Sequence, residues 1–145
     1  MSVIALLLSG ALSAPLPEPI ALASDGQLQC WSPDTARKTC LALATFKLRD
    51  DGAIEASAVV QVSSRPPATM EIAIPVEVAD GQVCGAVRDQ VRETIRNFIG
   101  RRLCVAFLLQ GASLLAKPTL DGAPQRGMDQ TVIWVAPSQG YSVAP

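Results

Sequence analysis

Two stretches in which apolar residues alternate along one face, 41–49 and 53–62, constrain the fold more than any other feature of this chain. The turn sequence DDG separates them, which is typical of a β-hairpin. A three-residue loop places Leu48 opposite Ile54, whereas a two-residue turn would place Leu48 opposite an acidic residue. Because both apolar faces must meet the core, we expect the longer loop, with Gly52 in the left-handed conformation. The apolar face of the hairpin comprises Ala42, Ala44, Phe46, Leu48, Ile54, Ala56, Ala58, Val60 and Val62.

Residues 70–78 alternate in the same way and predict a third strand. Pro75 lies on the outer face of this strand and cannot donate to a β-ladder, so we expect an edge strand or a kink there. The sequence ADG then predicts a tight turn that sets Val78 opposite Val83. The inward face of the strand comprises Met70, Ile72, Ile74, Val76 and Val78.

The apolar period changes over residues 86–99, which predicts one main helix ending before Gly100. Further strands are expected over 103–109, 113–120 and 131–136. The predicted class is α+β, a mostly antiparallel sheet of five to seven strands with the helix on one face. The apolar stripe of the predicted helix comprises Val87, Val91, Ile95, Phe98 and Ile99.

The N-terminal residues have the pattern of an export signal. Residues 3–14 form an uncharged apolar run, too short to span a bilayer but the right length for a signal-peptide core. A proline-rich segment follows, and the sequence ALA ending at Ala23 offers a cleavage site. We therefore predict a signal peptide over 1–23, with an earlier cut after Ser13 as the alternative. Residues 24–145 then form a single periplasmic or extracellular domain without a transmembrane segment.

Four cysteines in an exported chain favour disulfides over free thiols. Three pairings are possible, and we expect the two local ones, because each closes a short loop worth about 3 kcal/mol in the chain-entropy description. The spacing contains no tight C-x2-4-C knuckle, so a structural zinc site is not expected. The expected disulfides are Cys30–Cys40 and Cys84–Cys104.

The segment between the first two cysteines, CWSPDTARKTC, predicts a short helical turn closed by a disulfide. Ser32 suits an N-cap, and Pro33 suits the first helical position. Trp31 either packs over the disulfide or forms an exposed binding aromatic. Arg37 and Lys38 lie at the tip of this loop and are candidate binding residues.

The composition excludes several kinds of chemistry. The chain has no histidine, which rules out imidazole zinc sites and Ser-His or Cys-His nucleophile pairs within it. A net charge of −1 provides no field for nucleic acid. We recognise no catalytic motif, and therefore expect no enzyme activity, cofactor or metal. Asp129 could act as an acid or base or cap a strand, and supports the alternative of a carboxylate-dependent enzyme.

Three arginines, Arg88, Arg92 and Arg96, share one face of the predicted helix and could hold phosphate or carboxylate groups. The alternative is a solvated face that neighbouring acids partly neutralise. Trp134 is a further candidate binding residue, because alternation places it either in the core or in an exposed apolar stripe.

The CWSPDTARKTC segment, the DDG and ADG turns and the closing sequence MDQTVIWVAPSQGYSVAP resemble a group of small exported bacterial proteins without an assigned activity. The resemblance covers much of residues 28–145, with a shortened region around the predicted helix. It implies bacterial export and no particular ligand or catalytic residue. We predict an exported, non-enzymatic domain that binds a protein or an envelope component. The alternatives are binding of an anion or small molecule, through the arginine face or a sheet pocket, and a carboxylate-dependent enzyme.

Overall fold

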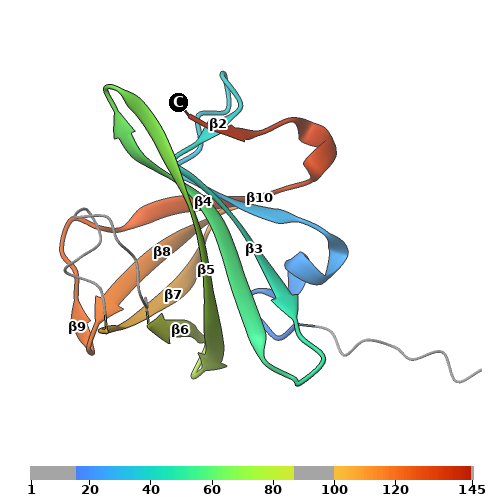
Figure 1. The fold of residues 1–145 in the computed structure, drawn as a ribbon, viewed down its shortest axis with the longest axis vertical. Coiled ribbons are helices and arrows are strands. Elements are labelled where there is room, and N and C mark those ends of the chain that lie inside the picture. Colours follow the sequence, from blue (N-terminus) through green and yellow to red (C-terminus); the bar gives the residue numbers. More distant parts are fainter. Residues whose placement is uncertain (1–15, 87–99, 145) are drawn as a thin grey trace, which may run out of the picture.

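The computed structural model of the protein describes residues 16–86 and 100–144, which are mostly β-strand (Figure 1). Two short 3-10 helices, η1 (Ala21–Asp25) and η3 (Pro137–Gln139), also occur in this part of the chain. The strands are β1 (Leu28–Trp31), β2 (Thr39–Cys40), β3 (Ala42–Leu48), β4 (Ile54–Ser64), β5 (Pro67–Ala79), β6 (Gln82–Ala86), β7 (Arg102–Gln110), β8 (Ser113–Leu120), β9 (Ala123–Pro124), β10 (Gln130–Val135) and β11 (Ser142–Val143).

Eight of these strands form a closed antiparallel barrel. They pair in the order β1-β3-β4-β5-β6-β7-β8-β10, and β10 pairs with β1 to close the ring. The predicted α+β class is therefore wrong, and closure is the physical reason. A sheet that pairs its own two edges encloses its apolar face within the ring. β9 extends the sheet beside β8, and β2 and β11 form a separate parallel pair.

The main helix predicted over 86–99 lies almost wholly outside the described residues. Ala86 is described, and it is the last residue of β6 rather than the start of a helix. The barrel closes through a pair of strands distant in the sequence, since Gln29 of β1 lies opposite Trp134 of β10. Local alternation predicts the longer strands, but it reveals neither β1 nor this pairing, and it therefore predicts an open sheet.

The predicted register of the first hairpin is confirmed. Leu48 of β3 lies opposite Ile54 of β4, and Gly52 in the connecting loop has a φ of 85°. The tight turn after β5 is confirmed too, since Val78 pairs with Val83. Register follows the apolar face, because a shift of one residue would turn every inward side chain outward.

The expectation that β5 is an edge strand is wrong, since β4 and β6 flank it on both sides. Pro75 is nevertheless tolerated, because it lies just outside the β5–β6 ladder. The pairing of β5 with β6 begins at Val76, one residue after the proline, so this ladder does not require a Pro75 amide.

Both predicted disulfides, Cys30–Cys40 and Cys84–Cys104, are present. The loop that the first one closes is not helical, which corrects the predicted helical turn. Asp34 and Thr39 instead exchange backbone hydrogen bonds and close a tight hairpin-like turn. Ser32 is not an N-cap: its hydroxyl donates to Gln130 Oε1 on β10 at 2.9 Å. The bond to β10 draws Ser32 into the barrel wall rather than onto a helix end.

An N-terminal plug, residues 16–25, closes one end of the barrel. Leu16 and Ile20 are buried, at 5% and 0% exposure, and pack in one cluster with Phe46 and Ile54 at the β3–β4 end. The predicted signal peptide, 1–23, therefore includes residues that form part of the core. Cleavage after Ala23 would remove them, whereas the earlier cut after Ser13 would leave them in place.

A second apolar cluster lies on the outer side of β1. It consists of Cys30, Cys40 and Val135, with Tyr141 packed against it. The C-terminal β11 runs beside β2, as Figure 1 shows, and brings Tyr141 to the Cys30–Cys40 disulfide. Tyr141, rather than Trp31, therefore covers this disulfide.

Within residues 16–86 and 100–144, no helix has the length and apolar character required to cross a membrane.

Candidate binding cavity inside the barrel

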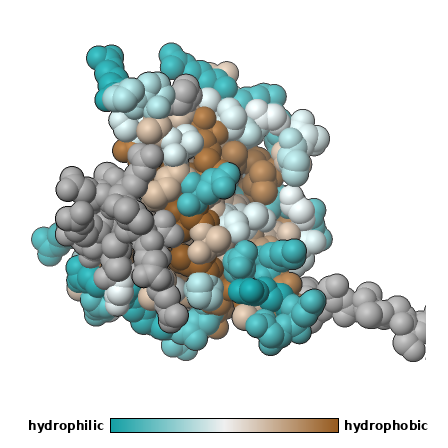
Figure 2. Space-filling view, viewed as in Figure 1, coloured by the Kyte–Doolittle hydropathy of each residue, from teal (hydrophilic) through white to brown (hydrophobic). Residues whose placement is uncertain are grey.

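The barrel encloses an apolar cavity of about 260 Å³. Many of the side chains around it are only half-buried although they point inward, which indicates that solvent reaches the cavity. In Figure 2, apolar side chains are visible along the middle of the molecule, with polar ones around them. The cavity is lined by Gln29, Trp31, Ala42, Ala44, Phe46, Ala56, Ala58, Val60, Ile72, Ile74, Val76, Val83, Gly85, Leu103, Val105 and Phe107.

Small residues on the inner wall leave this space open. An eight-stranded barrel has an interior that large side chains just fill, or that holds one small ligand when they do not. The inner face of the β3–β4 hairpin presents four alanines: Ala42, Ala44, Ala56 and Ala58. Gly85 on β6 adds no side chain, and a Cβ there would lie 2.9 Å from the Pro75 carbonyl oxygen.

The opposite wall of the barrel is tightly packed. Ala116 and Leu120 of β8 and Val132 of β10 are buried, with exposures of 0%, 3% and 0%. The cavity therefore lies against the β3–β7 side, between this packed wall and the alanines. The N-terminal plug closes one end, since Phe46 and Val83 both line the cavity and pack with the plug.

Gln29 is the polar residue in this otherwise apolar lining, and its exposure is 0%. Its Oε1 accepts a hydrogen bond from the indole Nε1 of Trp31 at 3.2 Å. The Nε2 atom is buried and has no hydrogen-bond partner among the described residues. Because an indole N–H can only donate, the bond to Trp31 fixes which end of the amide remains unpaired.

Three aromatic residues, Trp31, Phe46 and Phe107, form part of the cavity wall. Trp31 and Phe107 meet edge to face, with ring centroids 5.8 Å apart and an interplanar angle of 75°. In this geometry the positive edge of one ring meets the negative face of the other, which is favourable. Both rings line the cavity. Trp31 is a predicted binding candidate, and the structure places it in the lining beside Gln29.

A larger but shallower groove of about 680 Å³ crosses the outer face of β3–β5. It is lined in part by Leu43, Val59 and Ala73, which point away from the barrel axis. No buried polar side chain without a partner opens into it, among the described residues. The interior cavity is therefore the better-defined site.

The other predicted binding residues are not brought together. Arg37 is exposed on the 34–39 turn and forms a long ion pair with Asp34, at 4.0 Å; Lys38 is exposed beside it. Trp134 points inward and packs against the plug cluster, away from Trp31 in the cavity lining. The three arginines Arg88, Arg92 and Arg96 lie outside the described residues, so the predicted arginine face stays a prediction.

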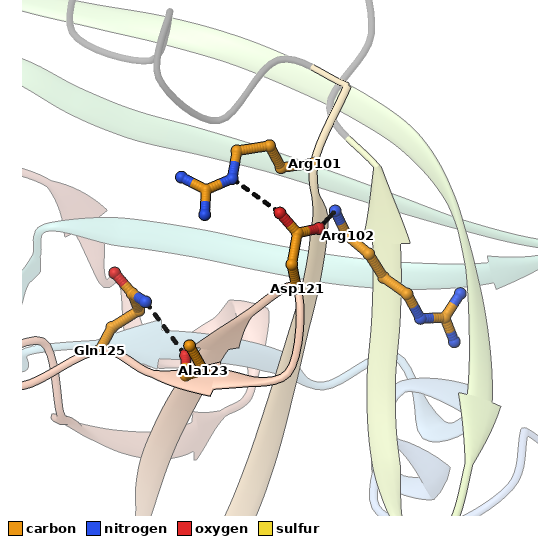
Figure 3. A network of polar contacts seen from close by, with 5 residues as sticks. All are labelled: Arg101, Arg102, Asp121, Ala123 and Gln125. Carbon is orange, nitrogen blue, oxygen red and sulfur yellow. Dashed lines mark hydrogen bonds and ion pairs between the residues drawn. The ribbon is translucent and has the colours of Figure 1, made fainter.

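Asp129, the candidate acid or base, lies in an ion pair with Lys117, with 3.6 Å between Oδ2 and Nζ. A more elaborate network surrounds Asp121 (Figure 3). Asp121 accepts hydrogen bonds from Arg101 Nε at 2.8 Å and from the Arg102 backbone N–H at 3.0 Å. The bond from Arg101, followed by that from Arg102, lowers the pKa of the Asp121 carboxyl below its ordinary value. This network joins the start of β7 to the end of β8.

Sequence reasoning missed Gln29 because a single glutamine in an apolar strand gives no motif. The available signal was that QLQCW places Gln29 and Trp31 on one face, with Cys30 on the other. Among the described residues, no group of three or more histidine, cysteine or acidic side chains could hold a metal ion.

Comparisons with protein families, with curated proteins and with solved structures found no match to this chain. The site is therefore interpreted from its own geometry. In the part of the chain that the structure describes, this geometry defines a small antiparallel barrel with an apolar interior, and the buried Gln29 amide in its wall has no partner.

Proposed function

We propose that the protein is a non-enzymatic binding protein that holds a small apolar molecule inside the barrel. The single observation that carries the proposal is the 260 Å³ apolar cavity among the inward-facing side chains. Ligand sites are typically concave and mostly apolar, with a few placed polar groups, and commonly measure roughly 300–1,000 Å³. This cavity lies just below that range, so it suits a small ligand.

The size of the cavity limits the ligand. At about 30 Å³ for each water-sized group, it accommodates roughly nine such groups. A compound of about ten non-hydrogen atoms would therefore fill it, and a longer one would extend through the solvent-exposed side.

The proposal is tested by titrating the protein with 1-indanone, a neutral bicyclic compound of suitable size, and following the heat of binding. We expect saturable one-to-one binding to the wild type, lost in Ala56→Leu, which fills the interior. Ala73→Leu is the matched control, because Ala73 is an exposed outer residue of β5 that lines the outer groove. Binding lost in the Ala73 variant but kept in the Ala56 variant would place the ligand in the outer groove and overturn the proposal.

Export to the periplasm or beyond is also part of the proposal. The two disulfides support it, because disulfides persist in oxidising compartments. The test is the mass of protein recovered from the periplasm after expression with its leader.

The alternative functions are binding of a protein or envelope partner and binding of anions through the predicted arginine face.

A further inference from the structure

We infer that the cavity takes a neutral apolar compound bearing a carbonyl group, and that Gln29 Nε2 donates a hydrogen bond to that carbonyl oxygen. The inference rests on the proposed function, because it specifies the ligand chemistry of the same cavity. Its evidence is a different observation, the buried amide nitrogen without a partner.

The orientation of the Gln29 side chain is determined by its neighbour. Trp31 Nε1 lies 3.2 Å from Gln29 Oε1, on the same face of β1 and two residues further along. An amide turned the other way would place two donors against each other, because the indole nitrogen and the amide nitrogen both donate hydrogen bonds and accept none. The Nε2 group is therefore presented as a donor.

Gln29 lines the cavity, and its amide nitrogen is buried in the cavity wall. In the barrel wall, Gln29 lies between Trp134 on β10 and Ala44 on β3. Ala44 in turn faces Ala58 on β4, so the row beside the amide is lined by methyl groups. A buried N–H without an acceptor is unfavourable, and among the described residues no protein acceptor pairs with it. A ligand carbonyl oxygen in the cavity would supply that acceptor.

The same lining selects against charged ligands. Gln29 is its polar member, and no ionisable side chain of the described residues contributes to it. A carboxylate or ammonium group would lose its hydration without gaining a partner of opposite charge, which is strongly unfavourable. The matching class is therefore small ketones, esters and lactones with an apolar body, not free fatty acids or amines.

The experiment compares two probes of nearly equal shape, indane and 1-indanone, in wild-type protein and in Gln29→Met. The quantity of interest is the ratio of the dissociation constants, Kd of indane over Kd of 1-indanone. Taking the ratio within each protein cancels the intrinsic hydrophobicity of each probe when the proteins are compared. We expect this ratio to fall about tenfold in Gln29→Met, which keeps the side-chain length and removes the donor.

Two further variants make the result specific. Gln82→Met is the matched control, because Gln82 is a half-buried glutamine on β6 that does not line the cavity; its ratio should equal that of the wild type. The double variant Gln29→Met/Trp31→Phe removes the indole N–H, which could otherwise replace the amide as the donor. Unchanged ratios in both Gln29 variants, with both probes still bound, would overturn the inference and leave the proposed function intact. Failure of both probes to bind the wild type would overturn both.

A measurement on the wild type covers the case in which the Gln29 variants do not fold. The side-chain amide protons of Gln29 give a distinct pair of signals in a ¹H–¹⁵N NMR spectrum. We expect 1-indanone to shift this pair downfield and indane to leave it nearly unmoved. Equal movement with both probes would contradict a hydrogen bond to the carbonyl.

Discussion

Filling the interior with one larger side chain tests how much free space the cavity provides. Ala56 is the suitable position, because it lines the cavity on the inner face of β4 and lies opposite Phe46 and Ile74. The substitution Ala56→Leu would place the added carbons in space that no other side chain occupies. We expect it to stabilise the fold and to abolish binding of 1-indanone.

The magnitude follows from the added apolar group. Leucine exceeds alanine by about three methylene equivalents, and each is worth about 0.8 kcal/mol when fully buried, or about 2.4 kcal/mol in total. Rotamer restriction offsets part of this, at about 0.5–1 kcal/mol for leucine. A net gain of about 1.5 kcal/mol in the free energy of unfolding is therefore expected. In a well-packed core the same change would destabilise by about 1–3 kcal/mol.

An open cavity predicts a gain in the free energy of unfolding and a packed core predicts a loss, so urea denaturation distinguishes the two. The control is Ala73→Leu on the exposed face of β5, which should change the free energy of unfolding by less than about 0.5 kcal/mol. A loss of more than about 1 kcal/mol in Ala56→Leu, with the control unchanged, would refute the reasoning, because it would show that the interior is already filled.

Three further predictions concern the plug, the leader and the Asp121 network. Ile20→Ala should lower the free energy of unfolding by about 2–5 kcal/mol, because Ile20 is completely buried in the plug cluster; urea denaturation measures it. Exported protein should begin after Ser13 rather than after Ala23, because the later cut removes the plug; intact mass measures it. Asp121→Asn should be less stable than the wild type at pH 7, and this difference should disappear in acid. The pKa of Asp121 is lowered in the folded state, so its contribution is complete above the ordinary value of about 3.9 and is lost as the pH falls through the lowered folded value.

Each of these predictions has a control and a contrary result. Leu22→Ala, at a residue that is 40% exposed, should change stability much less than Ile20→Ala, and equal losses would argue against the plug. A mature protein that begins at Ser24 and unfolds at the same urea concentration as a longer form would show that the plug is dispensable. For Asp121, Asp129→Asn is the control, and a stability difference between Asp121→Asn and the wild type that persists at about pH 2 would contradict the charged network.

Local pattern was enough to predict the longer strands and the first register, but not β1. The alternation from Ala42 to Val60 and the DDG loop determine which residues face inward, and the structure confirms the Leu48–Ile54 pair. The disulfides were also predictable, because each closes a short loop, with sequence separations of 10 and 20 residues. These features depend on contacts between residues close in sequence.

Closure of the barrel and formation of the cavity depend on contacts between distant residues. The pairing of β1 with β10 joins Gln29 to Trp134, and no short-range pattern encodes it. Alanines at positions 42, 44, 56 and 58 predict an inward face equally well in a packed sheet and in a hollow barrel. The unpaired Gln29 amide becomes visible only when the ring of strands closes around it.

The most direct measurement of the central claim is the position of bound 1-indanone, from isotope-filtered NMR contacts between the probe and protein methyl groups. We expect contacts to Ala56 and Val105, which line the cavity, together with movement of the Gln29 amide signals. Contacts confined to Leu43 and Val59 would place the probe in the outer groove and contradict a ligand site inside the barrel.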